Sequence, residues 1–187
     1  MEIRLATPEI QRDSIVDGEG IRSIIWTQGC RHHCPGCHNP ETHSFTTGFL
    51  LDTEEIKQKI KALEAQDGIT FSGGDPMEQA TACTDIAKFC KSIGLNVWCY
   101  TGYTFEELLK KAKIDKSIKD FLENIDVLVD GRFMLSEKSY DVIFRGSKNQ
   151  RLIDVPKSLK KNKVVLVEKF ENSLQNQKGR KNHYMYV

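Results

Sequence analysis

The stretch Ile21-Arg22-Ser23-Ile24-Ile25-Trp26-Thr27 decides the fold. Its β-branched and aromatic residues are typical of a strand. A loop that is rich in cysteine, glycine and proline follows it directly, over residues 29–40. The sequence therefore predicts a strand whose carboxyl end leads into a loop with reactive side chains.

Strands and helices alternate along the rest of the chain. The further predicted strands cover residues 69–72, 95–100 and 126–130, with later candidates at 142–144 and 164–167. Cap residues and apolar spacing predict helices after Asp52 and Thr104, a short helix over 118–122, and a helix with the buried stripe Cys83, Ile86, Ala87 and Cys90. This order indicates a parallel α/β sheet with outer helices. A complete (β/α)₈ barrel needs about 250 residues, so 187 residues predict a partial barrel.

Length and charge exclude several classes of protein. A chain of 187 residues predicts a single domain over 1–187, with the polar residues 170–187 as a candidate flexible tail. Lys and Arg number 27 against 26 Asp and Glu, which argues against nucleic-acid binding. The longest apolar runs fall far short of the roughly 18 residues of a membrane span. With no signal-like start, the sequence predicts a cytoplasmic protein without a membrane partner.

Three of the six cysteines lie within eight positions, as Cys30-x₃-Cys34-x₂-Cys37. Thiolates at such short spacing can converge on one metal centre. A four-iron cluster held by three cysteines keeps one iron without a protein ligand, which is the open position that a reactive site needs. A Cys₃His zinc site is an alternative, because four histidines are close in sequence: His32, His33, His38 and His43. A disulfide is less expected in a cytoplasmic chain.

The other cysteines have apolar surroundings. Cys83, Cys90 and Cys99 are expected to be buried and to act as small apolar side chains.

A glycine turn, Ser72-Gly73-Gly74-Asp75-Pro76, follows the second predicted strand. In α/β sheets, ligands bind at the carboxyl ends of the strands. Adjacent glycines let the backbone approach a ligand closely, and Asp75 can accept hydrogen bonds from an ammonium group. An ordinary tight turn would explain the same residues if they stood alone.

Together, the cysteine motif and the glycine turn resemble the radical S-adenosylmethionine superfamily. Residues 17–22, Asp-Gly-Glu-Gly-Ile-Arg, and 37–42, Cys-His-Asn-Pro-Glu-Thr, are similar to the glycyl-radical-enzyme activases. Three further stretches resemble the activases of anaerobic ribonucleoside-triphosphate reductase: 98–104, 127–133 and 145–151. The match runs in order from about Asp13 to Leu152.

The resemblance implies a fold and a cluster site. The fold would be a partial (β/α)₆-type barrel of the radical S-adenosylmethionine type. Cys30, Cys34 and Cys37 would hold a [4Fe-4S] cluster, whose fourth iron is chelated by S-adenosylmethionine. Gly36, Cys37 and His38 would pass their backbone beside the adenine.

The resemblance also implies contacts to the methionine part of the cofactor. Gly73, Gly74 and Asp75 would meet the methionine ammonium. Asp130 and Arg132, at the end of another strand, would contact the methionine carboxylate or a cation.

The implied activity is reductive cleavage of S-adenosylmethionine to methionine and a 5′-deoxyadenosyl radical, which abstracts hydrogen from a glycine of anaerobic ribonucleoside-triphosphate reductase. The electron would come from a low-potential donor such as flavodoxin. The alternatives are an activase of pyruvate formate-lyase or of another glycyl radical enzyme, and a small radical enzyme with a small-molecule substrate. An iron–sulfur electron carrier and a zinc-stabilised interaction module represent other classes.

Overall fold

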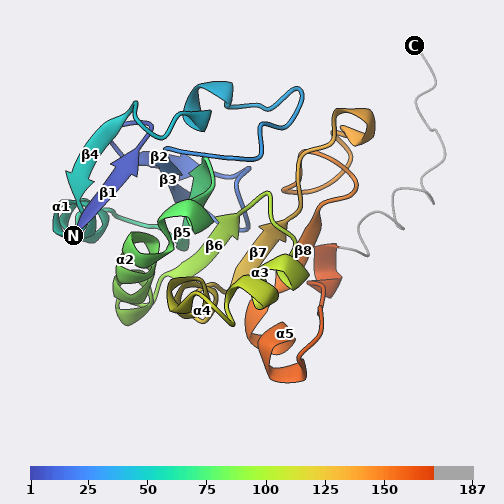
Figure 1. Ribbon diagram of the computed structural model, residues 1–187. Coiled ribbons are helices and arrows are strands. Elements are labelled where there is room, and N and C mark those ends of the chain that lie inside the picture. Colours follow the sequence, from blue (N-terminus) through green and yellow to red (C-terminus); the bar gives the residue numbers. More distant parts are fainter. Residues whose placement is uncertain (171–187) are drawn as a thin grey trace, which may run out of the picture.

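An open eight-stranded sheet forms the centre of the computed structural model, which describes residues 1–170 (Figure 1). The strand order is β4-β1-β3-β5-β6-β7-β8, and β2 pairs with β3 outside this path. The predicted tail lies outside the described residues from 171 onward, and the single domain over 1–187 stays a prediction. No helix within residues 1–170 is long and apolar enough to cross a membrane.

Four parallel strands form the middle of this sheet. They are β3 (Arg22–Thr27), β5 (Gly68–Gly73), β6 (Asn96–Tyr100) and β7 (Val127–Asp130). These strands confirm the four main strand predictions and the parallel α/β class. Their carboxyl ends lie at one edge of the sheet, so the cysteine loop and the glycine turn begin there side by side.

Antiparallel strands extend the sheet and were missed in the sequence. They are β1 (Glu2–Leu5), β2 (Gln11–Ser14), β4 (Phe49–Asp52) and β8 (Arg151–Asp154). In β2 three of the four residues are exposed, and in β4 no residue is fully buried. Such strands lack the apolar alternation that identifies a strand in a sequence.

Two strand predictions were wrong. Residues 142–144 form a turn, and Phe144 has a left-handed backbone with φ of 56°. Within 164–167, only an isolated bridge joins Leu166 to Ile153 of β8. Ile143, Phe144 and Val167 pack in the cluster around Trp98, whereas Val164 and Leu166 pack against the main core, so burial rather than strand pairing explains their composition.

The helices cover one face of the sheet. They are α1 (Thr53–Lys61), α2 (Ala80–Ser92), α3 (Phe105–Lys111), α4 (Lys116–Leu122) and α5 (Val155–Lys161). Alternate strand residues such as Ile69, Phe71 and Val97 pack against their apolar sides in the main core. Trp98 lies between Val97 and Cys99, which face the main core. Its side chain therefore points to the opposite face of the sheet, where it packs in a smaller cluster with Val129 and Leu152. Cys83, Cys90 and Cys99 are fully buried, as predicted.

Removal of a central core side chain should cost much of the stability. Phe71 is fully buried in β5, and its ring packs edge-on against Phe121 of α4 with centroids 5.4 Å apart. Phe71→Ala should lower the free energy of unfolding by about 3–5 kcal/mol, measured by denaturant titration. Phe49→Ala, at a half-exposed position of β4, should cost under about 1 kcal/mol. Equal losses would contradict this placement of the core.

Candidate functional site

The loops after the four parallel strands enclose one cavity. It has a volume of about 330 Å³, and its walls include Cys30, Cys34, Cys37, His38, Gly73 and Gly74. The ends of β6 and β7 contribute Thr101 and Gly131. The fold therefore brings the cysteine motif and the glycine turn to the same place, although Cys37 and Ser72 are 35 positions apart in the chain.

A larger cavity, of about 720 Å³, lies at the opposite ends of these strands. Arg22, Asn96 and Val127, at or near the amino ends of β3, β6 and β7, belong to its walls. No cysteine lines it. Ligands of α/β sheets bind at carboxyl ends, so the smaller cavity is the candidate site.

The three thiols surround the cavity and do not converge on one point. All three are free; Cys30 is buried, while Cys34 and Cys37 are partly exposed. Within residues 1–170, no three His, Cys, Asp or Glu side chains are grouped to hold a single metal ion. Three cysteines on the walls of one cavity are the ligand type of an iron–sulfur cluster, in which each thiolate binds a different iron.

Burial opposes ionisation of two of these thiols, Cys30 and Cys34. It raises the pKa of Cys30 to about 11 and also raises the pKa of Cys34. Iron binds the thiolate, so loading the site releases protons and compensates for the buried charge.

The nearby histidines have other neighbours than the cysteines. The rings of His33 and His43 pack edge-on with centroids 4.8 Å apart. His38 packs on Phe133 at 4.7 Å, and His32 bonds to Asp75. Within residues 1–170, no histidine joins the cysteines in a group that could hold one metal ion, as a Cys₃His zinc site requires.

The glycine turn packs directly on the start of the cysteine loop. The N–H of Gly74 donates to the carbonyl of Thr27 at 2.7 Å, and the N–H of Asp75 donates to the carbonyl of Gly29 at 2.8 Å. A Cβ on Gly74 would stand 2.4 Å from the Gly29 oxygen. Gly73 has φ of +99°, where other residues are strained. Both glycines are thus required by the backbone packing itself.

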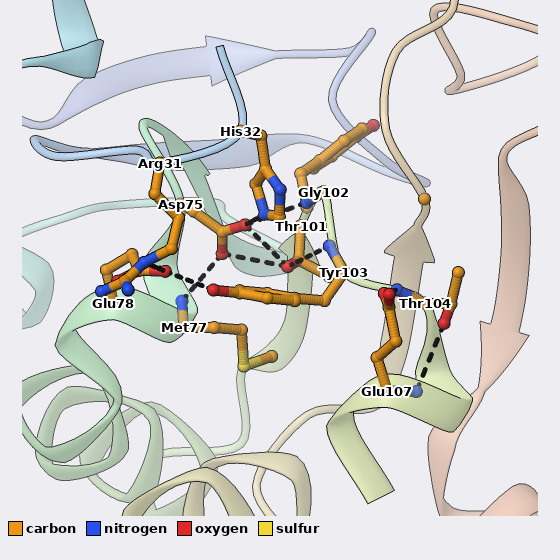
Figure 2. A network of polar contacts seen from close by, with 12 residues as sticks. Arg31, His32, Asp75, Met77, Glu78, Thr101, Gly102, Tyr103, Thr104 and Glu107 are labelled. Carbon is orange, nitrogen blue, oxygen red and sulfur yellow. Dashed lines mark hydrogen bonds and ion pairs between the residues drawn. The ribbon is translucent and has the colours of Figure 1, made fainter. Parts of the chain in front are cut away.

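Asp75 is buried behind this turn and does not line the cavity. Figure 2 shows its carboxylate among donors from three segments. It accepts from the N–H of Met77 at 3.0 Å and from the hydroxyl of Thr101 at 2.9 Å. The N–H of Gly102 at 2.9 Å and Nε2 of His32 at 2.8 Å complete the set. Contact between Asp75 and a methionine ammonium stays a prediction, because this carboxylate already has four partners.

The remaining predicted residues, Gly36, Arg132 and Asp130, are not among those that line this cavity. Gly36 has φ of +73° and contacts Leu135, while Arg132 lines an adjoining groove with Cys34. Asp130 is buried; it accepts from the N–H of Phe105 at 2.7 Å and pairs with Arg151. Their roles toward the cofactor stay predictions.

Sequence reasoning missed the side chains that hold the loops together. His32 was considered only as a zinc ligand, and Thr101 was given no role. A signal was present, since His32 lies within the cysteine motif and Thr101 directly follows another predicted strand.

Known proteins match this chain in sequence. The family model described as "4Fe-4S single cluster domain" matches residues 16–153. The anaerobic ribonucleoside-triphosphate reductase-activating protein of Haemophilus influenzae is 34% identical over 145 residues, covering 73% of this chain and 89% of that protein. The chain belongs to this family of activating proteins. The family and the matched domain imply a [4Fe-4S] cluster and S-adenosylmethionine as cofactors, as the sequence predicts.

Other members of the family match over the same share of the chain. The activating protein of Escherichia coli is 34% identical, covering 73% of this chain and 90% of its own. The activating protein of Enterobacteria phage T4 is 30% identical, and the match covers 73% of this chain and 86% of the phage protein. Among solved structures, QueE from Escherichia coli aligns with a TM-score of 0.46 and 15% identity, over 56% of this chain and 54% of its own.

Iron binding should depend on the cavity cysteines alone. Alanine at Cys30, Cys34 or Cys37 should abolish the [4Fe-4S] signal, because each thiolate holds one iron. Alanine at Cys83 or Cys90 should leave the iron content unchanged, since both are buried in the helix-covered core. Iron analysis and absorbance after anaerobic reconstitution measure both sets. Loss of iron only in the Cys83 variant would overturn the assignment.

A side chain at Gly74 should disturb the cysteine loop itself. Gly74→Ala places a methyl group against the Gly29 backbone, next to Cys30. We expect incomplete iron loading and at least tenfold weaker S-adenosylmethionine binding, measured by iron analysis and calorimetry. Gly94→Ala is the control, because Gly94 has φ of +85° but no atom within 4 Å of its added Cβ. Full iron loading of Gly74→Ala would refute the close-packing argument.

Proposed function

We propose that this chain is a radical S-adenosylmethionine activase that generates the glycyl radical of anaerobic ribonucleoside-triphosphate reductase. The main support for this proposal is that the three cysteines and the Gly73–Gly74 turn line one cavity at the carboxyl ends of parallel strands. Membership of the activating-protein family supports the choice of protein substrate.

The residues of the cavity fit the cofactors in kind and position. Cys30, Cys34 and Cys37 would hold the cluster, with one iron left open for S-adenosylmethionine. The bound, reduced cluster would supply one electron for cleavage of S-adenosylmethionine to methionine and a 5′-deoxyadenosyl radical. The protein's own contribution is to orient the cofactor and to exclude water.

Different residues would contact different parts of the cofactor. The backbone of Gly73 and Gly74 would lie against the methionine part of S-adenosylmethionine, because a side chain at either position would obstruct the close approach. His38 lines the cavity with Cys37 and Phe133 and would face the adenine end. Arg132, near Cys34, provides positive charge for the methionine carboxylate.

A neighbouring groove gives a protein substrate access to this site. Its volume is about 490 Å³, and it shares four wall residues with the cluster cavity: Asp17, His38, Tyr100 and Gly146. Ile15, Val16 and Tyr140 lie on its walls and are strongly exposed. Exposed apolar side chains next to a reactive cavity favour a protein surface as the substrate.

The electron source is a further part of the proposal. A low-potential one-electron donor such as flavodoxin would reduce the cluster. A cytoplasmic location and the absence of nucleic-acid and membrane partners stay predictions from the sequence.

The reaction itself tests the proposal. Reduced, cluster-loaded protein mixed anaerobically with S-adenosylmethionine should release methionine and 5′-deoxyadenosine, quantified by chromatography. Addition of an anaerobic ribonucleotide reductase should give a glycyl radical doublet in electron paramagnetic resonance. Deuterium at the target glycine Cα should appear in 5′-deoxyadenosine. Cleavage without the doublet would reject the reductase as substrate, and cluster reduction without cleavage would indicate an electron carrier.

A further inference from the structure

A loop between β7 and β8, residues 139–146, forms much of the groove that adjoins the cluster cavity (orange in Figure 1). All of its residues except Asp141 line this groove, together with residues 15–17 after β2. The loop is closed at its base, where the N–H of Ser139 donates to the carbonyl of Gly146 at 3.3 Å. The place of its tip depends on contacts with the rest of the fold.

Tyr100, at the end of β6, holds this tip. Its hydroxyl donates to the carbonyl of Phe144 at 2.9 Å. Phe144 has φ of 56°, a backbone conformation that a bulky residue rarely adopts unless its surroundings hold it there. The Phe144 ring also packs edge-on against Trp98 of β6, with centroids 5.4 Å apart. The hydrogen bond and the ring contact together fasten the loop to the sheet.

Gly146, at the other end of the loop, packs against the wall of the cluster cavity. A Cβ at this position would stand 3.1 Å from the Phe133 ring and 3.2 Å from the His38 ring. Both rings line the cluster cavity, as does Tyr100. The loop therefore rests on residues of the cavity wall at two points, and these residues set its position relative to the cavity.

The groove offers an apolar contact surface at the side of the cavity. Ile15, Val16 and Tyr140 are 71%, 70% and 90% exposed and lie on its walls. Exposed apolar and aromatic side chains gathered in one place are typical of protein contact surfaces. Because the groove and the cavity share wall residues, a protein segment bound here lies next to the cofactor site. Membership of the activating-protein family favours the reductase as the occupant.

We propose that residues 15–17 and 139–146 form the docking surface for the reductase, and that Tyr100 is a positioning residue for this surface. Its bond to Phe144 holds the loop in the conformation that binds, so the reductase does not have to order the loop on binding. The inference rests on the proposed function, because it takes the reductase as the protein substrate. It adds the surface that binds this substrate and the residue that keeps the surface in place.

Tyr100→Phe tests the positioning role, because it removes the hydroxyl and keeps the ring. Loss of one hydrogen bond should weaken binding of the reductase to iron-loaded protein about 3- to 10-fold, measured by calorimetry. The reductase concentration for half-maximal glycyl radical formation should rise by the same factor, with a smaller change in the maximal rate. Amide hydrogen exchange at residues 140–145 should be faster in the free variant. Unchanged affinity would overturn the positioning role.

Tyr140→Ala tests the surface itself without disturbing the core, since this side chain is 90% exposed. It should weaken reductase binding about fivefold or more, as loss of an aromatic contact in an interface does. In the wild type, added reductase should slow amide exchange at residues 15–17 and 139–146. A glycyl radical formed without this protection would reject the docking surface while the proposed function stands. Protection without any glycyl radical would support the docking surface and reject the proposed function.

A matched control separates positioning from general stability. Ser158 in α5 is fully buried, and its hydroxyl donates to the carbonyl of Asp154 at 2.6 Å and accepts from the N–H of Val165 at 2.9 Å. It lines neither the cluster cavity nor the groove. Ser158→Ala should lower the melting temperature but leave the affinity for the reductase unchanged. Equal weakening of binding by Ser158→Ala and Tyr100→Phe would indicate a general loss of stability and overturn the proposal.

Discussion

The buried carboxylate of Asp75 is the constraint on which the arrangement of the site depends. A buried charge is tolerated only when hydrogen bonds replace the water it has lost. Asp75 obtains these bonds from His32, Met77, Thr101 and Gly102, which belong to three different segments. The segments after β3, β5 and β6 must therefore meet around it. The cavity with the three cysteines lies beside this meeting point.

A second buried charge fixes the opposite end of the parallel strands. Arg22 donates to the hydroxyl of Thr70 at 2.7 Å, to the carbonyl of Ile69 at 2.8 Å and to the carbonyl of Asn96 at 3.1 Å. Burial lowers the pKa of Arg22 to about 10. Its guanidinium joins β3, β5 and β6 at their amino ends, while Asp75 joins the segments at their carboxyl ends. The register of these strands is thus fixed by polar groups at both ends of an apolar core.

Much of the site could be predicted from the sequence, because its chemistry follows short motifs. Three cysteines within eight positions predict a metal site, and adjacent glycines after a strand indicate a close backbone approach. The role of Asp75 could not be predicted in this way. Its partners His32 and Thr101 lie 43 and 26 positions away in the chain, and only the packing of parallel strands brings them together.

The sequence by itself determined the four parallel strands, the cysteine motif and the glycine turn, since each depends on local composition and spacing. Tertiary structure decided the antiparallel edge strands, whose exposed residues carry no periodic signal. It also decided that apolar residues near Phe144 pack on Trp98 without forming a strand. The division has one physical reason. Covalent spacing fixes which groups can act together locally, whereas burial and hydrogen bonding between distant segments fix where those groups point.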